Sequence, residues 1–575
     1  MRTLPTLSCL ASAVVLTCAA DSMPVSSETS ATGLSNLVAA VAADLERPVR
    51  PGGVDGRPFW NVNGRGMRYI YPPAFDFAAV QGAAKYRFTV IDDVLNEHVF
   101  ESAHPFADLS PVWKEIPVGY VRVQVDARTA DGRVLGGGGV RRFWRAAPYE
   151  PGAYAGRPWS YSACVRRYYP VLFNHGNSQH FLKHGTPDGV TDLFNIYPSK
   201  MNSALVRGMV RYSRMGDKHA GDALKIAKAA ADFMISISQP ADAPLANFPP
   251  TYRAMEGQKT NFANRRFAGQ VMLVYPAVMG IAYLELHEAC GDARYLDAAI
   301  GIARTYERLQ LPEGTWYVKM HESDGSPVVG EPDARPILLI PTRVCDFMDR
   351  LATATGDARW REVERRAFAY VENGPLRTWD WSAQFEDTPP TEGHRNPSSV
   401  EAMGVARYIL RRFPQDAARR GQARELMRWV EDQFVFWRKP CRADGRSVLT
   451  GPERGFRPWV RPDDPEGRPF SEWIDVPGVT EKYTWSVMEN SLAASMMSLY
   501  LDFYRLEKDE LCLAKAKTLG DSIVRVQQMG GDGEIASEWF ASYAVGARCP
   551  HIWMNCSVST AICMEDAAKL LGEWQ

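Results

Sequence analysis

The stretches that decide the fold are three near-repeats of one helical hairpin. They read RMGDKHAGDALKIAKAAADF from Arg214, ACGDARYLDAAIGIARTYERL from Ala289 and ATGDARWREVERRAFAYV from Ala354. In each repeat a turn follows one helix, and a second helix carries Ala and apolar residues at helical spacing. Because the pattern recurs roughly every 60 to 90 residues, it predicts a series of helical hairpins joined by variable loops.

Two weaker copies follow, RFPQDAARRGQARELMRWVEDQF from Arg412 and RLEKDELCLAKAKTLGDSIVRVQ from Arg505. The first helix of each pair is the more apolar one, as in GQVMLVYPAVMGIAYLEL at 269–286, which suits an inner ring covered on both sides. Long loops between hairpins of this length favour a closed ring over an open solenoid. The predicted fold class is therefore mainly α, an (α/α)6-type helical toroid over residues 200–575.

The chain before the helical repeats has a different periodicity. KYRFTVID, YVRVQVDAR and VRRFWRA alternate between apolar and polar residues, and the Asp-Gly turn of RTADGRVLGGGG joins two such runs. This pattern predicts a small β-sandwich of the immunoglobulin or fibronectin kind at 53–148. The Pro- and Gly-rich stretch AAPYEPGAYAGRPW marks the boundary, so we expect 149–199 to be a connecting segment.

The first residues have the composition of a secretory signal. In MRTLPTLSCLASAVVLTCAADS one Arg precedes an apolar run that small residues follow, which predicts a signal peptide at 1–20. Residues 21–52 are rich in Ser, Ala, Pro and Gly, which predicts a tether. We expect an exported protein that is periplasmic, secreted or on the outer surface, and a lipid anchor at Cys18 is the alternative. No later stretch has the length and apolarity of a membrane span.

Bulk composition narrows the class of ligand. The chain has 575 residues with a formal net charge of −1, so it offers no overall electrostatic footprint for nucleic acid. It contains 16 Trp, a composition that favours a ligand with flat apolar faces, such as a pyranose ring. No dinucleotide or phosphate-loop fingerprint occurs at a strand-to-helix junction, so we predict no organic cofactor. The expected partner is a carbohydrate, and the oligomeric state stays open.

A β-sandwich followed by an α/α toroid on an exported chain resembles many carbohydrate-active enzymes. The hairpin repeats and the turns in LPEGTWYV and GGDGEI resemble the unsaturated glucuronyl hydrolase and rhamnogalacturonyl hydrolase families. The two-domain layout resembles glycoside hydrolase family 154 more closely, and this likeness implies β-glucuronidase-like activity. The compact unsaturated glucuronyl hydrolases lack the sandwich, so their catalytic residues are not transferred to this chain.

One polar and aromatic loop stands out, RTWDWSAQFEDTPPTEGHRN from Arg377 to Asn396. Glycoside hydrolysis generally uses two carboxyl groups, one protonated and one ionised. We therefore predict that Glu386 or Asp387 is the general acid. Further candidate sugar contacts in this loop are Trp381, His394, Arg395 and Asn396. The alternative is a capping loop whose tryptophans fill the core.

The second candidate stretch is WIDVPGVTEKYTWSVMEN, from Trp473 to Asn490. Glu481 is the predicted base or nucleophile, and Tyr483 is a predicted substrate contact. Alternatively, Thr480 caps the following helix and Glu481 is a first-turn acid favoured by the helix dipole.

Other loops supply further candidate contacts. The predicted substrate-binding residues outside the two stretches above are Arg265, Tyr197, Trp553 and Asn555. Lys200 belongs to the segment Asn174–Asn202, which also holds His175, His180 and His184. Because the spacing of these histidines is not a strong zinc signature, we predict no metal site.

Three functions fit this set of residues. The first is a glycoside hydrolase that acts on a uronic-acid-containing glycan, with Arg265, His394 and Arg395 holding the sugar carboxylate. The second is a polysaccharide lyase or C5-epimerase, which needs a base such as Tyr483, Tyr197 or His394 and groups that neutralise the carboxylate. The third is a glycan-binding protein without catalytic activity.

Overall fold

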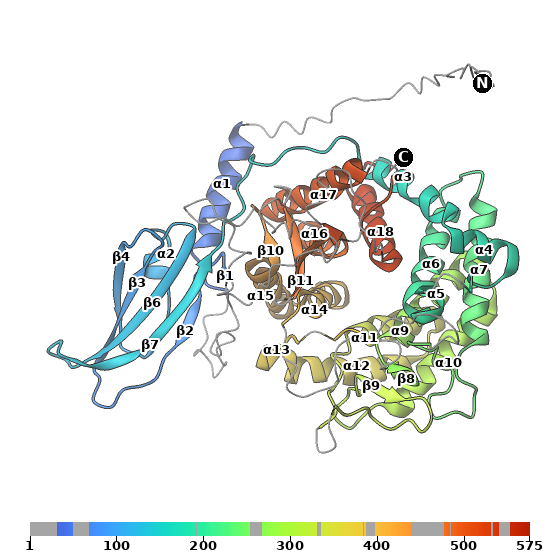
Figure 1. Cartoon of the computed structure of the whole chain (residues 1–575), viewed down its shortest axis with the longest axis horizontal. Helices are drawn as coiled ribbons and strands as arrows, with labels where there is room; N and C mark the ends of the chain where they lie inside the picture. Colours follow the sequence, from blue (N-terminus) through green and yellow to red (C-terminus); the bar gives the residue numbers. More distant parts are fainter. Residues whose placement is uncertain are drawn as a thin grey trace, which may run out of the picture.

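The computed structural model describes residues 31–49, 68–189, 193–253, 267–330, 335–382, 384–386, 397–438, 477–482, 485–530, 533–536, 538–539 and 553–574. Helices dominate this part of the chain, and a separate β-domain lies beside them (Figure 1). None of the described helices combines the length and apolarity that a bilayer span requires.

Inner helices of the described chain close into a ring (Figure 1). Each packs against the next in chain order, and α18 packs against α6, which completes the circle. The inner helices are α6 (Pro198–Ser213), α9 (Tyr275–Cys290), α11 (Thr342–Thr355), α14 (Ser399–Arg412), α16 (Asn490–Glu507) and α18 (Met554–Leu570). The predicted α/α toroid is thereby confirmed.

An outer helix covers each inner helix. The sequence repeats form the outer helices α7 (Ala220–Ser236), α10 (Ala293–Leu309), α12 (Ala358–Asn373), α15 (Ala417–Phe434) and α17 (Glu510–Gly530), which pair with the preceding inner helices. The sixth outer helix is α3 (Tyr161–Asn174), which packs on α18. The helical ring therefore includes part of the segment expected to be only a connection, and α3 joins the two ends of the ring.

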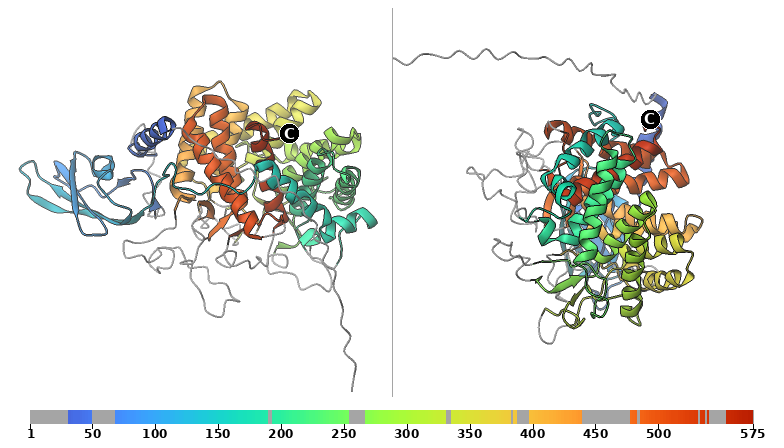
Figure 2. Two further views of the ribbon diagram at one scale, coloured as in Figure 1. Left: turned by 90° about the horizontal axis from the view of Figure 1, so that it is seen from above. Right: turned by 90° about the vertical axis from the view of Figure 1, so that its right-hand side faces the viewer.

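The two ends of the ring differ in their connections. Inner helices lead to outer helices through short turns, such as Gly291-Asp292 and Gly356-Asp357, where Gly adopts a φ of 70° and Asp caps the next helix. Outer helices return to inner ones through long connections that carry short strands (Figure 2). The long connections that enter the inner helices therefore share one end of the ring, and the short turns that leave them lie at the other.

The long connections carry two small sheets. One pairs β8 (Gln270–Met272) with β9 (Lys319–His321), and the other has the order β10 (Val435–Phe436), β11 (Gly478–Lys482), β12 (Trp485–Glu489), β13 (Glu538–Trp539). Shorter helices in the same part of the fold are α4 (Gly176–His184), α5 (Leu193–Ile196) and α13 (Pro375–Thr378). These elements fix the loops in front of the inner helices.

The axis of the ring is lined with ion pairs between neighbouring inner helices. Glu285 on α9 accepts from Arg207 at 3.0 Å and from Arg350 at 3.2 Å, which links α6, α9 and α11. Asp346 on α11 lies 2.7 Å from Arg411 on α14. Further pairs along the ring are Arg407–Asp502 at 3.1 Å and Arg211–Asp566 at 2.9 Å. Because the outer helices cover the apolar faces of the inner helices, the charged faces of the inner helices are directed toward the axis of the ring.

The β-domain is a small sandwich beside the ring (Figure 1). Its larger sheet has the order β1 (Arg68–Tyr69), β7 (Val134–Arg145), β6 (Gly119–Arg128), β3 (Lys85–Ile91), β4 (Glu97–Ser102), and its smaller sheet pairs β2 (Ala74–Asp76) with β5 (Phe106–Asp108). One-turn α2 (Ser110–Trp113) adds Trp113 to the core. Buried and half-exposed residues alternate along β3, as the period-two pattern predicted.

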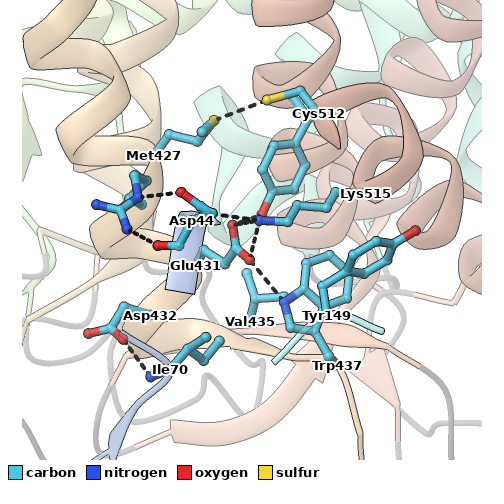
Figure 3. Close-up of polar contacts among 12 residues, drawn as sticks. Asp44, Ile70, Tyr149, Met427, Glu431, Asp432, Val435, Trp437, Cys512 and Lys515 are labelled. Atoms are coloured by element: carbon cyan, nitrogen blue, oxygen red, sulfur yellow. Dashed lines mark hydrogen bonds and ion pairs between the residues drawn. The ribbon is translucent and has the colours of Figure 1, made fainter. Parts of the chain in front are cut away.

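Residues 31–49 do not form the expected tether. They contain helix α1 (Ala31–Leu45), which packs against α17. The carboxylate of Asp44 lies 3.1 Å from Arg428 of α15 and 3.4 Å from Lys515 of α17 (Figure 3). A buried charge cluster therefore fastens this helix to the ring.

Candidate active site

The candidate site lies at the end of the ring where the long connections enter, here called the mouth. The first turns of the inner helices lie at this end, and each carries a polar side chain among its first three residues. These are Lys200 on α6, Tyr275 on α9, Arg343 on α11, Glu401 on α14, Ser491 on α16 and Asn555 on α18. One closed ring of helices thus brings side chains from distant parts of the sequence to one level.

Glu386 is the most constrained carboxylate at the mouth. It is buried and forms an ion pair with Lys200, and Tyr275 donates a hydrogen bond to its Oε2 at 2.5 Å. Its backbone carbonyl accepts from Tyr252 Oη at 2.5 Å and Lys319 Nζ at 2.8 Å. Both ends of the residue are therefore held, and the carboxylate has one orientation.

The electrostatic surroundings keep Glu386 ionised. Burial alone would raise the pKa of this carboxyl, but the Lys200 ammonium and the hydrogen bonds from Lys200 and Tyr275 lower the pKa to about 2. A group that is ionised at neutral pH fits the base or nucleophile of a hydrolase. This is the opposite of the general-acid role that we predicted for Glu386.

The loop that carries Glu386 is fastened to the ring. Gln384 Oε1 accepts from the Ile340 N–H at 2.9 Å, and its amide nitrogen donates to the Leu338 carbonyl at 3.0 Å. At the other end of the loop, the Ser398 N–H donates to the Trp381 carbonyl at 2.9 Å. The loop therefore connects the start of α11 with the start of α14.

Lys200 lies between the carboxylate and an aromatic group. Its Nζ is 4.3 Å from the centre of the Trp553 ring, and the Tyr197 and Trp553 rings lie 6.0 Å apart. Burial would lower the pKa of Lys200, but the charge of Glu386 raises it well above its usual value, and Glu481 adds to the rise. Lys200, which the sequence indicated only as one of several possible contacts, is thus central to the site.

Glu481 lies at the same end of the molecule but in a less buried position. It is the last residue but one of β11, and its carboxylate is 3.4 Å from Lys482 Nζ. The Ser399 hydroxyl donates to the Thr480 and Glu481 carbonyls, which fixes this strand to the start of α14. Glu481 therefore lies in the first strand of the antiparallel β11–β12 pair rather than opening a helix, so the alternative role as a first-turn helical acid is wrong.

Glu401 is a carboxyl that the sequence reasoning missed. It lies in the first turn of α14 and is buried. Burial raises its pKa to about 7, although the nearby Arg343 guanidinium opposes the rise. In the sequence, Glu401 stands two residues after Ser399, which begins the helix. An acid at this place is also common in helices without a catalytic role, because the helix dipole favours negative charge in the first turn. The mouth thus holds one carboxyl with a lowered pKa and one with a raised pKa.

Two of the predicted aromatic sugar contacts are buried in the protein. Trp381 is 0% exposed, and its ring packs edge-on against Trp379, which contacts Trp429 in the same way. It has no exposed face for a sugar, so the alternative of a core-filling tryptophan is correct. Tyr197 is 2% exposed and packs against Tyr252 and Trp553, so it supports the site from below its surface.

The remaining predicted contacts have different outcomes. Trp553 is half-buried at the start of α18. Asn555 donates to the sulfur of Cys556 at 3.5 Å, and its buried Oδ1 has no hydrogen-bond partner among the described residues. Predicted site residues outside the described part of the chain are Asp387, His394, Arg395, Asn396, Tyr483 and Arg265.

The three histidines of the segment Asn174–Asn202 lie on or next to the short helix α4. His175 caps α4, and the ring nitrogen of His180 contacts the Thr186 carbonyl at 2.6 Å. The rings of His180 and His184 lie 4.5 Å apart. Within the described ranges, no cluster of three or more His, Cys, Asp or Glu residues has the geometry of a metal site.

No protein-family model matches the sequence, and no curated protein is significantly similar to it. The fold is similar to cellobiose 2-epimerase from Spirochaeta thermophila, with 12% identity, a TM-score of 0.48, and coverage of 73% of this chain and 100% of that one. It is similar to a family 76 mannosidase from Bacteroides thetaiotaomicron, with 10% identity, a TM-score of 0.43, and coverage of 72% and 100%.

The fold is also similar to unsaturated glucuronyl hydrolase from Streptococcus agalactiae, with 11% identity, a TM-score of 0.40, and coverage of 70% of this chain and 91% of that one. Likenesses at these identities and scores do not assign a reaction to this chain.

Proposed function

We propose that this chain is a glycoside hydrolase, exported from the cell, that acts on a uronic-acid-containing glycan. The observation that carries the proposal is the pair of carboxyls at the mouth whose environments push their pKa values apart. Glu386 has a pKa of about 2 and Glu401 a pKa of about 7. Glycoside hydrolysis needs one ionised and one protonated carboxyl at neutral pH.

In this mechanism Glu386 either removes a proton from the water that attacks the anomeric carbon, or attacks that carbon itself and is later released by water. Lys200 and Tyr275 hold its carboxylate in place, so it needs no reorganisation during the reaction. Glu401 donates the proton to the leaving oxygen, because its raised pKa keeps much of it protonated near neutral pH. Half-buried Trp553 offers an apolar surface 4.3 Å from the Nζ of Lys200, the partner of Glu386.

The test is incubation of the protein with uronic-acid polysaccharides and oligosaccharides, with reducing ends and enoate absorbance followed together. New reducing ends without the enoate band support hydrolysis. An enoate band would show a lyase instead, and saturable binding without either signal would show a glycan-binding protein. Each of these two results would overturn the proposal.

The acid and base roles are tested with Glu386→Gln, Glu401→Gln and the exposed control Glu362→Gln on α12. We expect each mouth variant to lose roughly 10²- to 10⁴-fold in kcat/KM on a glycan. On an aryl glucuronide with a good leaving group, Glu401→Gln should recover most of its rate, because that reaction needs little protonation. Equal loss on both substrates would exclude Glu401 as the proton donor.

A further inference from the structure

Arg343 differs from the other arginines of the inner helix faces. Arg207, Arg211, Arg350, Arg407 and Arg411 each form an ion pair with a carboxylate on a neighbouring inner helix. Arg343 is exposed, and its guanidinium makes no ion pair or side-chain hydrogen bond with any residue that the structure describes. Its charge acts on the nearby carboxyls of Asp346 and Glu401, but it forms an ion pair with neither of them.

Helical geometry places Arg343 at the mouth. Residues 343, 346 and 350 share one face of α11. Asp346 and Arg350 face the axis, where they pair with Arg411 and Glu285. Arg343 lies one turn closer to the entering loops than Asp346, at the level of Lys200 and Glu401 on the other helices. Its side chain is therefore positioned where a ligand at the mouth would lie.

The neighbouring acids do not neutralise Arg343 fully. Asp346 is already shared between Arg350 at 3.1 Å and Arg411 at 2.7 Å. Glu401 is buried, and burial favours its neutral form because it raises the pKa to about 7. The positive charge of Arg343 is therefore available to an external anion near neutral pH.

The other cations at the mouth have partners in the protein. Lys200 pairs with the Glu386 carboxylate, and Lys319 donates to the Glu386 carbonyl at 2.8 Å. Lys482 lies 3.4 Å from Glu481. Among the described basic residues of the mouth, Arg343 is thus the best placed to receive a carboxylate from a substrate.

We propose that Arg343 binds the carboxylate of a uronic acid at the mouth, an inference that rests on the function proposed above and names its specificity residue. A guanidinium presents a planar pair of N–H donors that matches a carboxylate, whereas a neutral hexose offers only hydroxyls. Arg343 is tied to the catalytic loop, since the Ile340 N–H, three residues before it, donates to Gln384 at 2.9 Å. This hydrogen bond holds the start of α11 beside the loop that carries Glu386.

The binding test uses D-glucuronate, D-galacturonate and D-glucose as probes in calorimetric titrations of the full chain. The variants are Arg343→Gln, Arg343→Lys and the exposed control Arg365→Gln on α12. We expect Arg343→Gln to weaken binding of at least one uronate about 10- to 100-fold, because a hydrogen-bonded charge pair contributes about 1.5–3 kcal/mol. Glucose binding should not change, Arg343→Lys should recover part of the loss, and Arg365→Gln should match the wild type.

Kinetics on an aryl glucuronide and the matching aryl glucoside supply a second readout. Arg343→Gln should raise KM for the glucuronide and leave the glucoside KM unchanged. If Arg343→Gln loses uronate binding while the wild type releases no reducing ends, the carboxylate site stands and the hydrolase proposal fails. If the wild type hydrolyses the glycan and Arg343→Gln binds uronate equally well, the hydrolase stands and the carboxylate site is excluded. A wild type that prefers no uronate over glucose would also exclude it.

Discussion

Two buried lysine–carboxylate pairs in this protein have similar chemistry but different surroundings. Lys200 pairs with Glu386 at the mouth, next to half-buried Trp553. Lys515 lies 2.8 Å from Glu431 in a cluster that also includes Asp44 of the N-terminal helix (Figure 3). The comparison shows that a buried ion pair alone does not identify an active site.

The second pair joins segments far apart in the sequence. Lys515 also lies 3.3 Å from the Tyr71 hydroxyl, and Tyr500 donates to Glu431 at 2.7 Å. Trp437 covers Glu431 with a hydrogen bond of 3.1 Å. Every one of these partners belongs to the protein interior, so this cluster has a structural role, whereas the mouth pair adjoins residues that a ligand can reach.

The largest effect should come from breaking the interior pair with Lys515→Met. The substitution leaves the buried carboxylates of Asp44 and Glu431 without the Lys515 ammonium. We therefore expect the free energy of unfolding to fall by about 3–5 kcal/mol. Chemical denaturation of this variant and of Lys517→Met, an exposed position on the same helix, measures it. Equal stability of the two variants would show that the cluster does not hold the N-terminal helix to the ring.

The next effect should come from Lys200→Met at the mouth. Without the ammonium, the Tyr275 hydrogen bond still opposes the effect of burial, and the pKa of Glu386 should rise from about 2 by about 2 units, worth about 3 kcal/mol. The acidic limb of the kcat/KM profile should therefore move to higher pH, and Lys200→Arg should restore it. An unmoved limb in a folded Lys200→Met variant would mean that Glu386 does not act as the ionised catalytic group.

Acid should weaken the protein partly through Glu386. Its folded pKa of about 2 lies below the usual value of 4.5, so its contribution to stability is present above pH 4.5 and is lost as the pH falls toward 2. The complete loss of this contribution lowers the free energy of unfolding by about 3 kcal/mol. Denaturation of wild type and Glu386→Gln between pH 5 and about pH 2.5 should give curves that converge in acid. Parallel curves would contradict the depressed pKa.

The smallest effects should come from single tyrosine hydroxyls, and they sharpen the comparison. Tyr275→Phe removes a donor to Glu386, and Tyr500→Phe removes a donor to Glu431. Each substitution should lower the free energy of unfolding by about 1.5–3 kcal/mol, because the lost hydrogen bond has a charged acceptor. We expect Tyr275→Phe to change the pH profile of activity and Tyr500→Phe to change only the unfolding midpoint. If Tyr500→Phe changed the pH profile of activity and Tyr275→Phe changed only the unfolding midpoint, the roles of the two clusters would be exchanged.

Much of the site could not be read from the sequence, for a physical reason. Glu386 was identified because carboxyls in an aromatic loop are chemically distinctive. The sequence named Glu386 or Asp387 as the general acid and could not choose between them, because the low pKa of Glu386 depends on Lys200, which lies 186 residues earlier. Trp381 has the composition of a sugar platform, but only the fold shows that its ring is covered by Trp379.

The sequence by itself determined the local structure. Helical periodicity in the repeats predicted the hairpins and the toroid, and period-two alternation predicted the sandwich, because both patterns depend on residues a few positions apart. Only the tertiary structure decided which helix closes the ring, how α1 is held by Asp44, and that Arg343 forms no ion pair with any residue that the structure describes. These features depend on contacts between segments hundreds of residues apart, and the burial and charge created there set the pKa values of the site.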